Sequence, residues 1–209
     1  MNTRDDVIKS VLAYNANDLF HYKAIGIVDR DNFRDLSELQ EKDIYVLAAN
    51  EVENILCDEE IIDKSIIHFC TPNNYTVENF KKDFFDLFNK NIDSLSKEFV
   101  TDYINDRIHS SFITNRKDIE RIKEEFSQIH TIDIDDIYSS RKSFLESLYD
   151  SKNYTEALSH SNLKKSLTRQ LANKVIDHYE DRVLEYISRT PEIKELLINK
   201  YFSGIPQNI

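Results

Sequence analysis

The sequence predicts an α/β fold in which a small parallel sheet is followed by a predominantly helical remainder. Two short apolar runs rich in Ile and Val, at residues 22–29 and 44–49, predict strands. After these runs, apolar residues recur at helical spacing almost to the end of the chain. The 209 residues include only two glycines and three prolines. Turns that need a positive φ are therefore scarce, which favours long helices.

The first part of the chain alternates between helix and strand. Residues 4–15 predict an amphipathic helix, and residues 22–29 predict a strand buried on both faces of a parallel sheet. A polar stretch at 32–42 leads to a second strand of the same kind at 44–49. This strand passes into a helix that opens near Asn50 with acids in its first turn. The order is that of part of an open α/β sheet.

The rest of the chain predicts helices. The longest covers 76–113, and its aromatic stripe predicts a helix core rather than a platform for stacking bases. A change of character near Thr71 divides the chain into an α/β core at 1–70 and a helical insertion with a C-terminal helical region at 71–209. The other predicted helices cover 116–129, 134–150, 162–188 and 191–202, and the last starts with Thr190 as N-cap before Pro191.

Composition limits the classes of function. The net charge of -11 means that the surface as a whole does not attract phosphate, so a nucleic-acid role needs a cation, a local basic patch or a partner chain. Cys57 and Cys70 lack the spacing of a metal site or disulfide framework and predict buried thiols. No apolar run is long enough to span a membrane and the start does not resemble a signal peptide, so we expect a cytoplasmic protein.

Four acidic residues follow the two predicted strands. Asp29 and Asp31, separated by one residue, come at the end of the first strand, where alternation points them to the same side. Glu51 and Glu53 follow the second strand. The carboxyl ends of strands in open α/β sheets bind ligands, and if the strands are neighbours the four acids meet there. Converging carboxylates suit Mg²⁺ ions that act on a phosphodiester.

Each acidic pair also has a simpler interpretation. Asp29 and Asp31 are residue types common in solvated turns after strands. Glu51 and Glu53 are favoured at the start of a helix by the helix dipole. These interpretations need no metal ion, and the sequence leaves them open.

The two motifs resemble a known family. Residues 25–33 (Ile-Gly-Ile-Val-Asp-Arg-Asp-Asn-Phe) and 47–56 (Leu-Ala-Ala-Asn-Glu-Val-Glu-Asn-Ile-Leu) look like the Toprim domain of OLD-type nucleases. They are most similar to the bacterial branch paired with ABC-type ATPases in anti-phage defence. The resemblance covers about residues 4–62 and implies a partial Toprim-like, Rossmann-like parallel sheet.

The resemblance implies Mg²⁺- or Mn²⁺-dependent cleavage of DNA or RNA, with an ATPase partner and a homo-oligomer as a further expectation. Asp29 and Asp31 match the family's Asp-x-Asp ligands, Glu53 matches the acid of its Glu-Asn element, and Glu51 assists as a ligand. Lys164 or Lys165 is the candidate cation that stabilises phosphate charge. The alternative for this lysine pair is a solvated helix face.

One element of the family pattern is missing. Toprim domains begin with a strand that carries a glutamate, and no such strand precedes the first predicted helix. We therefore expect a truncated family member, a strand supplied by a neighbouring polypeptide, or a degenerate site.

Two other functions remain open. The first is a catalytically degenerate Toprim scaffold that serves as a protein-interaction module. The second is a phosphatase of the haloacid-dehalogenase kind with Asp29 as nucleophile, although such enzymes continue with a small pair of residues where this chain has Asn32 and Phe33.

Overall fold

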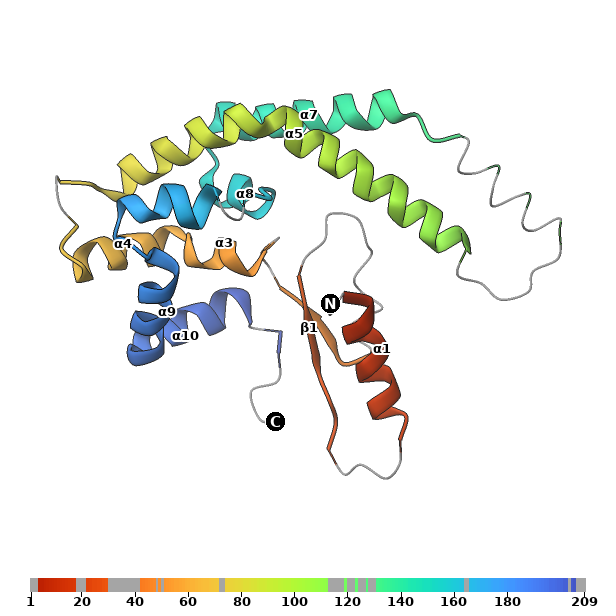
Figure 1. The fold of residues 1–209 in the computed structure, drawn as a ribbon, viewed down its shortest axis with the longest axis horizontal. Helices are drawn as coiled ribbons and strands as arrows, with labels where there is room; N and C mark the ends of the chain where they lie inside the picture. The colour runs from red at the N-terminus through yellow and green to blue at the C-terminus, as the bar shows by residue number, and fades with distance from the viewer. Residues whose placement is uncertain are drawn as a thin grey trace. The chain divides into compact units, whose positions relative to one another are not determined.

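The computed structural model shows a mostly helical chain with one small parallel sheet (Figure 1). The prediction of an α/β fold with a helical remainder is confirmed. In the part of the chain that is described, no helix has the length and apolar character needed to cross a membrane. The structure describes residues 4–17, 22–29, 42–47, 49, 51–71, 74–112, 119, 123, 127, 131–163, 166–202 and 204–205.

The chain forms two compact units. The first comprises Met1–Phe84 and Tyr154–Ile209, and the second comprises Phe85–Asn153. The long helix α5 (Val77–Phe112) begins in the first unit and continues into the second. The predicted junction near Thr71 concerns a change of secondary-structure class, and it stays a prediction.

The sheet of the first unit consists of β1 (Gly26–Val28) and β2 (Ile44–Val46), which pair in parallel with Gly26 opposite Ile44 and Val28 opposite Val46. Helix α1 (Arg4–Asn15), predicted at these residues, packs against β1. Val11, Val28 and Ile44 form the buried centre of this contact. Gly26 allows the close approach, because a Cβ built on it would lie 3.1 Å from methyl carbons of both Val7 and Val11.

The prediction that the first strand is buried on both faces is wrong. Gly26 and Val28 are buried, whereas Ile27 is 43% exposed. Successive strand side chains point to opposite faces. Among the described elements, α1 packs on the face of Gly26 and Val28. An unbroken apolar run therefore concealed an alternation in burial.

Asn15, at the end of α1, closes the amino-terminal edge of the sheet. Its Nδ2 donates to the Ala24 carbonyl at 2.9 Å, and its Oδ1 accepts from the Ala24 backbone N–H at 2.8 Å. Nδ2 also lies 3.2 Å from Oδ2 of Asp43, whose carbonyl accepts from the Gly26 N–H. One amide side chain thus joins the helix to both strand entries.

Helices make up the rest of the first unit. The prediction of a single helix over 162–188 is wrong. A π-helix and then a 3₁₀-helix cover Ser166–Lys174. His178 then adopts a left-handed φ of 57° before the next α-helix begins. Apolar spacing alone does not distinguish these backbone hydrogen-bond patterns. The elements are α3 (Val52–Leu56), α4 (Glu59–His68), α8 (Tyr154–Ser159), the π-helix η1 (Ser166–Leu171), the 3₁₀-helix η2 (Ala172–Lys174), α9 (Tyr179–Arg189) and α10 (Pro191–Tyr201).

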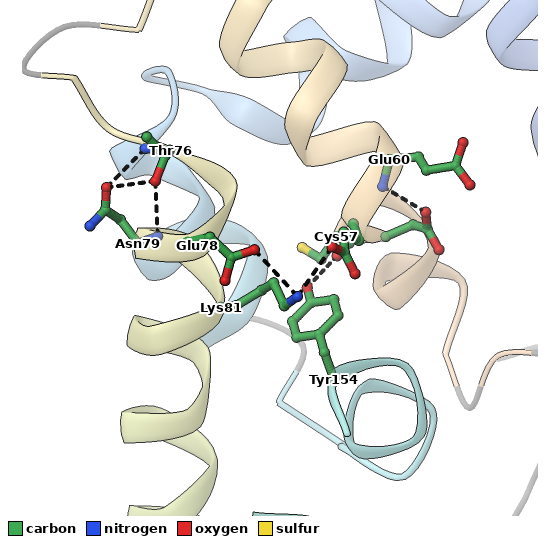
Figure 2. Close-up of polar contacts among 9 residues, drawn as sticks. Cys57, Glu60, Thr76, Glu78, Asn79, Lys81 and Tyr154 are labelled. Atoms are coloured by element: carbon green, nitrogen blue, oxygen red, sulfur yellow. Dashed lines mark hydrogen bonds and ion pairs between the residues drawn. The ribbon is translucent and has the colours of Figure 1, made fainter. Parts of the chain in front are cut away.

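The beginning of α5 is fixed by two sets of polar contacts (Figure 2). Thr76 and Asn79 cap each other's backbone N–H groups, which satisfies donors that a helix start leaves open. Lys81 then reaches Glu59 of α4 at 3.1 Å and Glu78 at 3.6 Å. Burial acts to lower the pKa of Lys81, but these carboxylates outweigh it and raise the pKa overall. The lysine therefore ties α5 to α4 as a cation.

The second unit pairs the later part of α5 with α7 (Ile134–Ser151). The rings of Phe85 and Tyr149 meet edge to face at 6.3 Å, and the Arg141 guanidinium lies 4.3 Å from the ring centre of Phe99. The predicted aromatic stripe is helix core, as its buried members Phe80, Phe84, Phe85 and Phe88 show. The predicted helix at 134–150 is confirmed, whereas that at 116–129 falls outside the described residues except at three isolated positions.

The two cysteines differ in environment. Cys57 is fully buried, and burial, with added effects of Asp58 and Glu180, raises the pKa of its thiol far above the usual range. Cys70 is exposed, so the prediction of two buried thiols is wrong for this residue. It lies just past the end of α4 in a turn with φ of 50°, where the chain leaves the helix.

Replacing Gly26 by Val tests the close contact between α1 and the sheet. We expect Gly26→Val to lower the free energy of unfolding by about 1–3 kcal/mol, because overpacking forces the valines of α1 aside. Ile27→Val on the exposed face is the control and should cost well under about 1 kcal/mol. Urea denaturation followed by circular dichroism measures both, and equal losses would contradict the packing described.

Thiol titration tests the burial of the cysteines. We expect one thiol of the native protein to react quickly with an aromatic disulfide reagent, and the second to react only after unfolding, because a buried protonated thiol is a poor nucleophile. Cys70→Ser should remove the fast phase and Cys57→Ser should leave it unchanged. Two fast thiols in the native wild type would contradict the structure.

Candidate metal site at the sheet edge

The parallel pairing brings the ends of β1 and β2 to the same edge of the sheet. Val28 lies opposite Val46, and the Leu47 N–H donates to the Val28 carbonyl at 3.0 Å. Asp29 follows Val28 directly and is partly buried. The premise that the two strands are neighbours is thus confirmed. In the sequence, Asp29 follows the end of β1, and Glu51 and Glu53 come after the end of β2.

Glu51 and Glu53 occupy different environments after β2. Glu51 stands at the N-cap position of α3 in an extended conformation and is only 8% exposed. Its side chain makes no capping hydrogen bond to the described backbone of α3. Glu53 lies in the first turn and is partly exposed, as expected of an acid stabilised by the helix dipole. The simpler interpretation suits Glu53 better than Glu51.

Asn54 connects α3 to the end of α8. It is 1% exposed, and its Nδ2 donates to the carbonyls of Leu158 and Ser161, each at 2.9 Å. Both carbonyls lie at the end of α8, and that of Leu158 also accepts from the Ser161 backbone N–H at 3.2 Å and from the Ser161 hydroxyl at 2.9 Å. Two carbonyl partners identify Nδ2 as the donor atom of the amide.

Tyrosine hydroxyls hold the corner between α3 and α4. Tyr179 of α9 donates to the Leu56 carbonyl at 2.6 Å, and Tyr154 of α8 donates to the Cys57 carbonyl, as Figure 2 shows for Tyr154. A helix of five residues leaves most of its terminal carbonyls without partners, and these hydroxyls supply them. Burial is the main cause that raises the pKa of both tyrosines well above the usual value, so both hydroxyls stay protonated donors.

Asp58 completes this corner with a buried carboxylate. Its Oδ1 accepts from the Glu60 N–H and so caps α4, while Oδ2 lies 2.6 Å from Nζ of Lys200. Oδ2 also accepts from the Tyr201 hydroxyl, whose pKa is raised by burial and by this hydrogen bond. The corner is therefore tied to α10, and Asp58 serves the fold rather than the sheet edge.

The described acids have the chemistry of metal ligands but are not gathered into a metal-binding group. Carboxylate oxygens are the ligands that Mg²⁺ and Mn²⁺ prefer. Within the described ranges no three Asp, Glu, His or Cys residues form a group that could hold a metal ion. Asp29, Glu51 and Glu53 do not suffice alone, and Asp31 and Lys164 lie outside the described residues.

Sequence reasoning missed the residues that hold this region together. Asn54 and Asp58 flank the short apolar run Ile-Leu-Cys on either side, which was a signal for buried polar anchors. The tyrosines gave no comparable signal, because their partners are backbone carbonyls about 100 or more positions away in the sequence.

Comparison of the chain with models of protein families, with curated proteins and with solved structures finds no match. The resemblance to OLD-type nucleases therefore stays a prediction from the two sequence motifs.

Removing the Asp58 carboxylate tests the corner. We expect Asp58→Ala to lower the free energy of unfolding by about 2–4 kcal/mol, because it removes a helix cap and leaves Lys200 and Tyr201 without their buried acceptor. Asp63→Ala, an exposed position of the same helix, is the control and should change stability by less than about 0.5 kcal/mol. Thermal unfolding and urea titration measure the difference, and matching effects would refute this role.

Proposed function

We propose that this chain binds Mg²⁺ or Mn²⁺ at the carboxyl edge of the β1–β2 sheet and cleaves phosphodiester bonds of DNA or RNA. The observation that carries the proposal is the parallel register of the two strands, with Val28 opposite Val46. It brings the end of β1, which Asp29 follows, beside the end of β2, after which the sequence leads to Glu51. This is the edge at which open α/β sheets bind ligands.

The proposed ligands are Asp29 and Asp31 with a glutamate from the start of α3. We propose Glu51 as the ligand of the two because it is buried. Glu53 is partly exposed, so we propose that it lies nearer the substrate. When bound, the cation would act as a Lewis acid on the phosphoryl oxygens. Lys164 is proposed to face the phosphate charge, and mutagenesis is the way to test it.

The charge of the chain supports a requirement for metal and a partner. With a net charge of -11, phosphate approaches this protein only where positive charge is supplied locally. A cation at the acidic edge supplies part of it. An ABC-type ATPase that presents the nucleic acid is the partner implied by the resemblance to OLD-type nucleases, and the two described strands would then belong to a larger Toprim sheet.

Substitution of the aspartates tests the proposal. We expect Asp29→Asn and Asp31→Asn each to reduce Mg²⁺-dependent cleavage of plasmid DNA or structured RNA about a hundredfold or more, because the Lewis-acid contribution of a bound cation is worth several kcal/mol. Asp43→Asn is a matched control at the opposite edge of the same sheet. Asp43 has a left-handed φ of 59°, which asparagine also tolerates. Oδ2 of Asp43 lies 3.5 Å from Nζ of Lys23.

Calorimetric titration with Mn²⁺ gives the second measurement. Binding should depend on Asp29 and not on Asp43. Cleavage that survives both aspartate substitutions would refute the nuclease. A folded protein without Asp29-dependent binding would instead support a protein-interaction scaffold, and hydrolysis of a simple phosphomonoester would favour the phosphatase alternative.

A further inference from the structure

The side of β1 that faces away from β2, its outer side, carries backbone groups that can pair with a further strand. The Gly26 N–H and the Val28 carbonyl each form a hydrogen bond of 3.0 Å with a residue that flanks β2. Backbone groups alternate in direction along a strand, so the N–H and carbonyl of Ile27 point to the outer side. Among the described residues the sheet ends there, with two strands. Groups of this kind are a template for another strand.

Ala24 continues this alternation before β1 begins. Its N–H and its carbonyl both pair with the Asn15 side chain, at 2.8 and 2.9 Å, as they would with a neighbouring strand. Asn15 also contacts Asp43, which precedes β2, so Ala24 directs its backbone groups to the β2 side. Ile25, the next residue, therefore directs its own groups to the outer side, together with those of Ile27.

The side chains along β1 do not protect its outer side. Strands at the edge of a sheet are usually guarded by a charge or a proline within the strand. Residues 25–28 are Ile-Gly-Ile-Val and contain neither, and the Ile27 side chain is 43% exposed. Charged residues stand only at the two ends of this stretch. They are Lys23, whose side chain is 79% exposed, and Asp29, which is partly buried.

The order of these residues is self-complementary. Lys23 and Asp29 lie three residues before and three residues after Gly26. When two copies of this stretch run antiparallel with Gly26 opposite Gly26, Lys23 of each copy lies opposite Asp29 of the other. Ile25 lies opposite Ile27, and these are the residues whose outward N–H and carbonyl groups can then exchange hydrogen bonds. Parallel pairing in register would instead set like charges side by side.

We propose that two copies of this chain form a two-fold symmetric dimer in which the outer sides of their β1 strands pair antiparallel. A two-fold interface joins the same surface of both copies, so it requires a self-complementary order such as that of β1. Because β1 has only three residues, the contact is small and we expect a weak dimer. The pairing needs no metal ion and does not rest on the proposed nuclease function.

Sedimentation equilibrium of the full chain in EDTA tests the dimer. At protein concentrations from about 1 to about 300 µM, a range that covers weak association, we expect the wild type to pass from monomer towards dimer. Ile27→Lys places a charge on the outer side and should weaken association about tenfold or more. Leu184→Lys is the matched control, because Leu184 is 50% exposed on α9, and it should change association by less than about twofold. Circular dichroism checks that both variants are folded.

Charge reversal tests the antiparallel register. Lys23→Glu and Asp29→Lys each replace two attractive contacts of the dimer with two repulsive ones, so each variant alone should associate about tenfold more weakly. An equimolar mixture of the two variants restores opposite charges at both contacts. The mixture should therefore associate about as tightly as the wild type, which a folding defect in either variant would prevent.

Three results would overturn the proposal. The first is a wild type that stays monomeric over the whole range, which would leave the outer side of β1 to a strand of another protein. The second is a dimer that Ile27→Lys does not weaken, since its contact must then lie elsewhere. The third is a mixture of the charge variants that associates no better than either variant alone. Binding of Mn²⁺ is measured separately, so failure here leaves the proposed metal site untouched.

Discussion

The fold of the first unit depends on hydrogen bonds from tyrosine hydroxyls to the corner between α3 and α4. Leu56, Cys57 and Asp58 are consecutive residues, and each accepts from a tyrosine on a different helix. Two short helices that meet at a corner expose several backbone carbonyls, and burying these without partners would be unfavourable. The tyrosines supply both the partners and the apolar rings that cover the corner. Helices α8, α9 and α10 are thereby gathered around three residues.

The two edges of the small sheet differ in the polar residues that follow them and in the contacts those residues make. At the amino edge, Asn15 pairs with Ala24 and Asp43, and Lys23 balances the Asp43 charge. At the carboxyl edge, Asp29 follows β1 directly, and the sequence after β2 leads to Glu51 and Glu53 at the start of α3. Among the described residues these acids do not form a metal-binding group. The metal site that we propose at this edge therefore stays a proposal.

The sequence predicted the elements far better than the contacts between them. Periodicity located α1, α5, α7 and α10, and the two apolar runs located β1 and β2, because burial of one helix face or one strand leaves a local pattern. The same reasoning failed at Ile27, whose exposure an unbroken apolar run does not reveal, and at residues 162–188, where apolar spacing cannot report the backbone hydrogen-bond pattern.

For the candidate site, the acids were predicted from their place after the strands and stay a prediction, whereas the buried anchors Asn54 and the tyrosines were not predicted. Their partners are carbonyls on distant segments, and a carbonyl has no side-chain identity that a sequence could reveal. The exposure of Cys70 was missed for a related reason, since its neighbours are apolar but the turn after α4 turns it outward.

The π-helix η1 gives its segment a tolerance to change in length. A π-helix closes each hydrogen bond over five residues and so contains one residue more than an α-helix that spans the same distance. Loss of a single residue here would restore α-helical spacing over that distance and leave the flanking side chains facing nearly the same way. The same loss in the middle of an α-helix would rotate the flanking side chains by about 100° relative to one another. A change of one residue is therefore accommodated more easily in η1 than within the long α-helices of the protein.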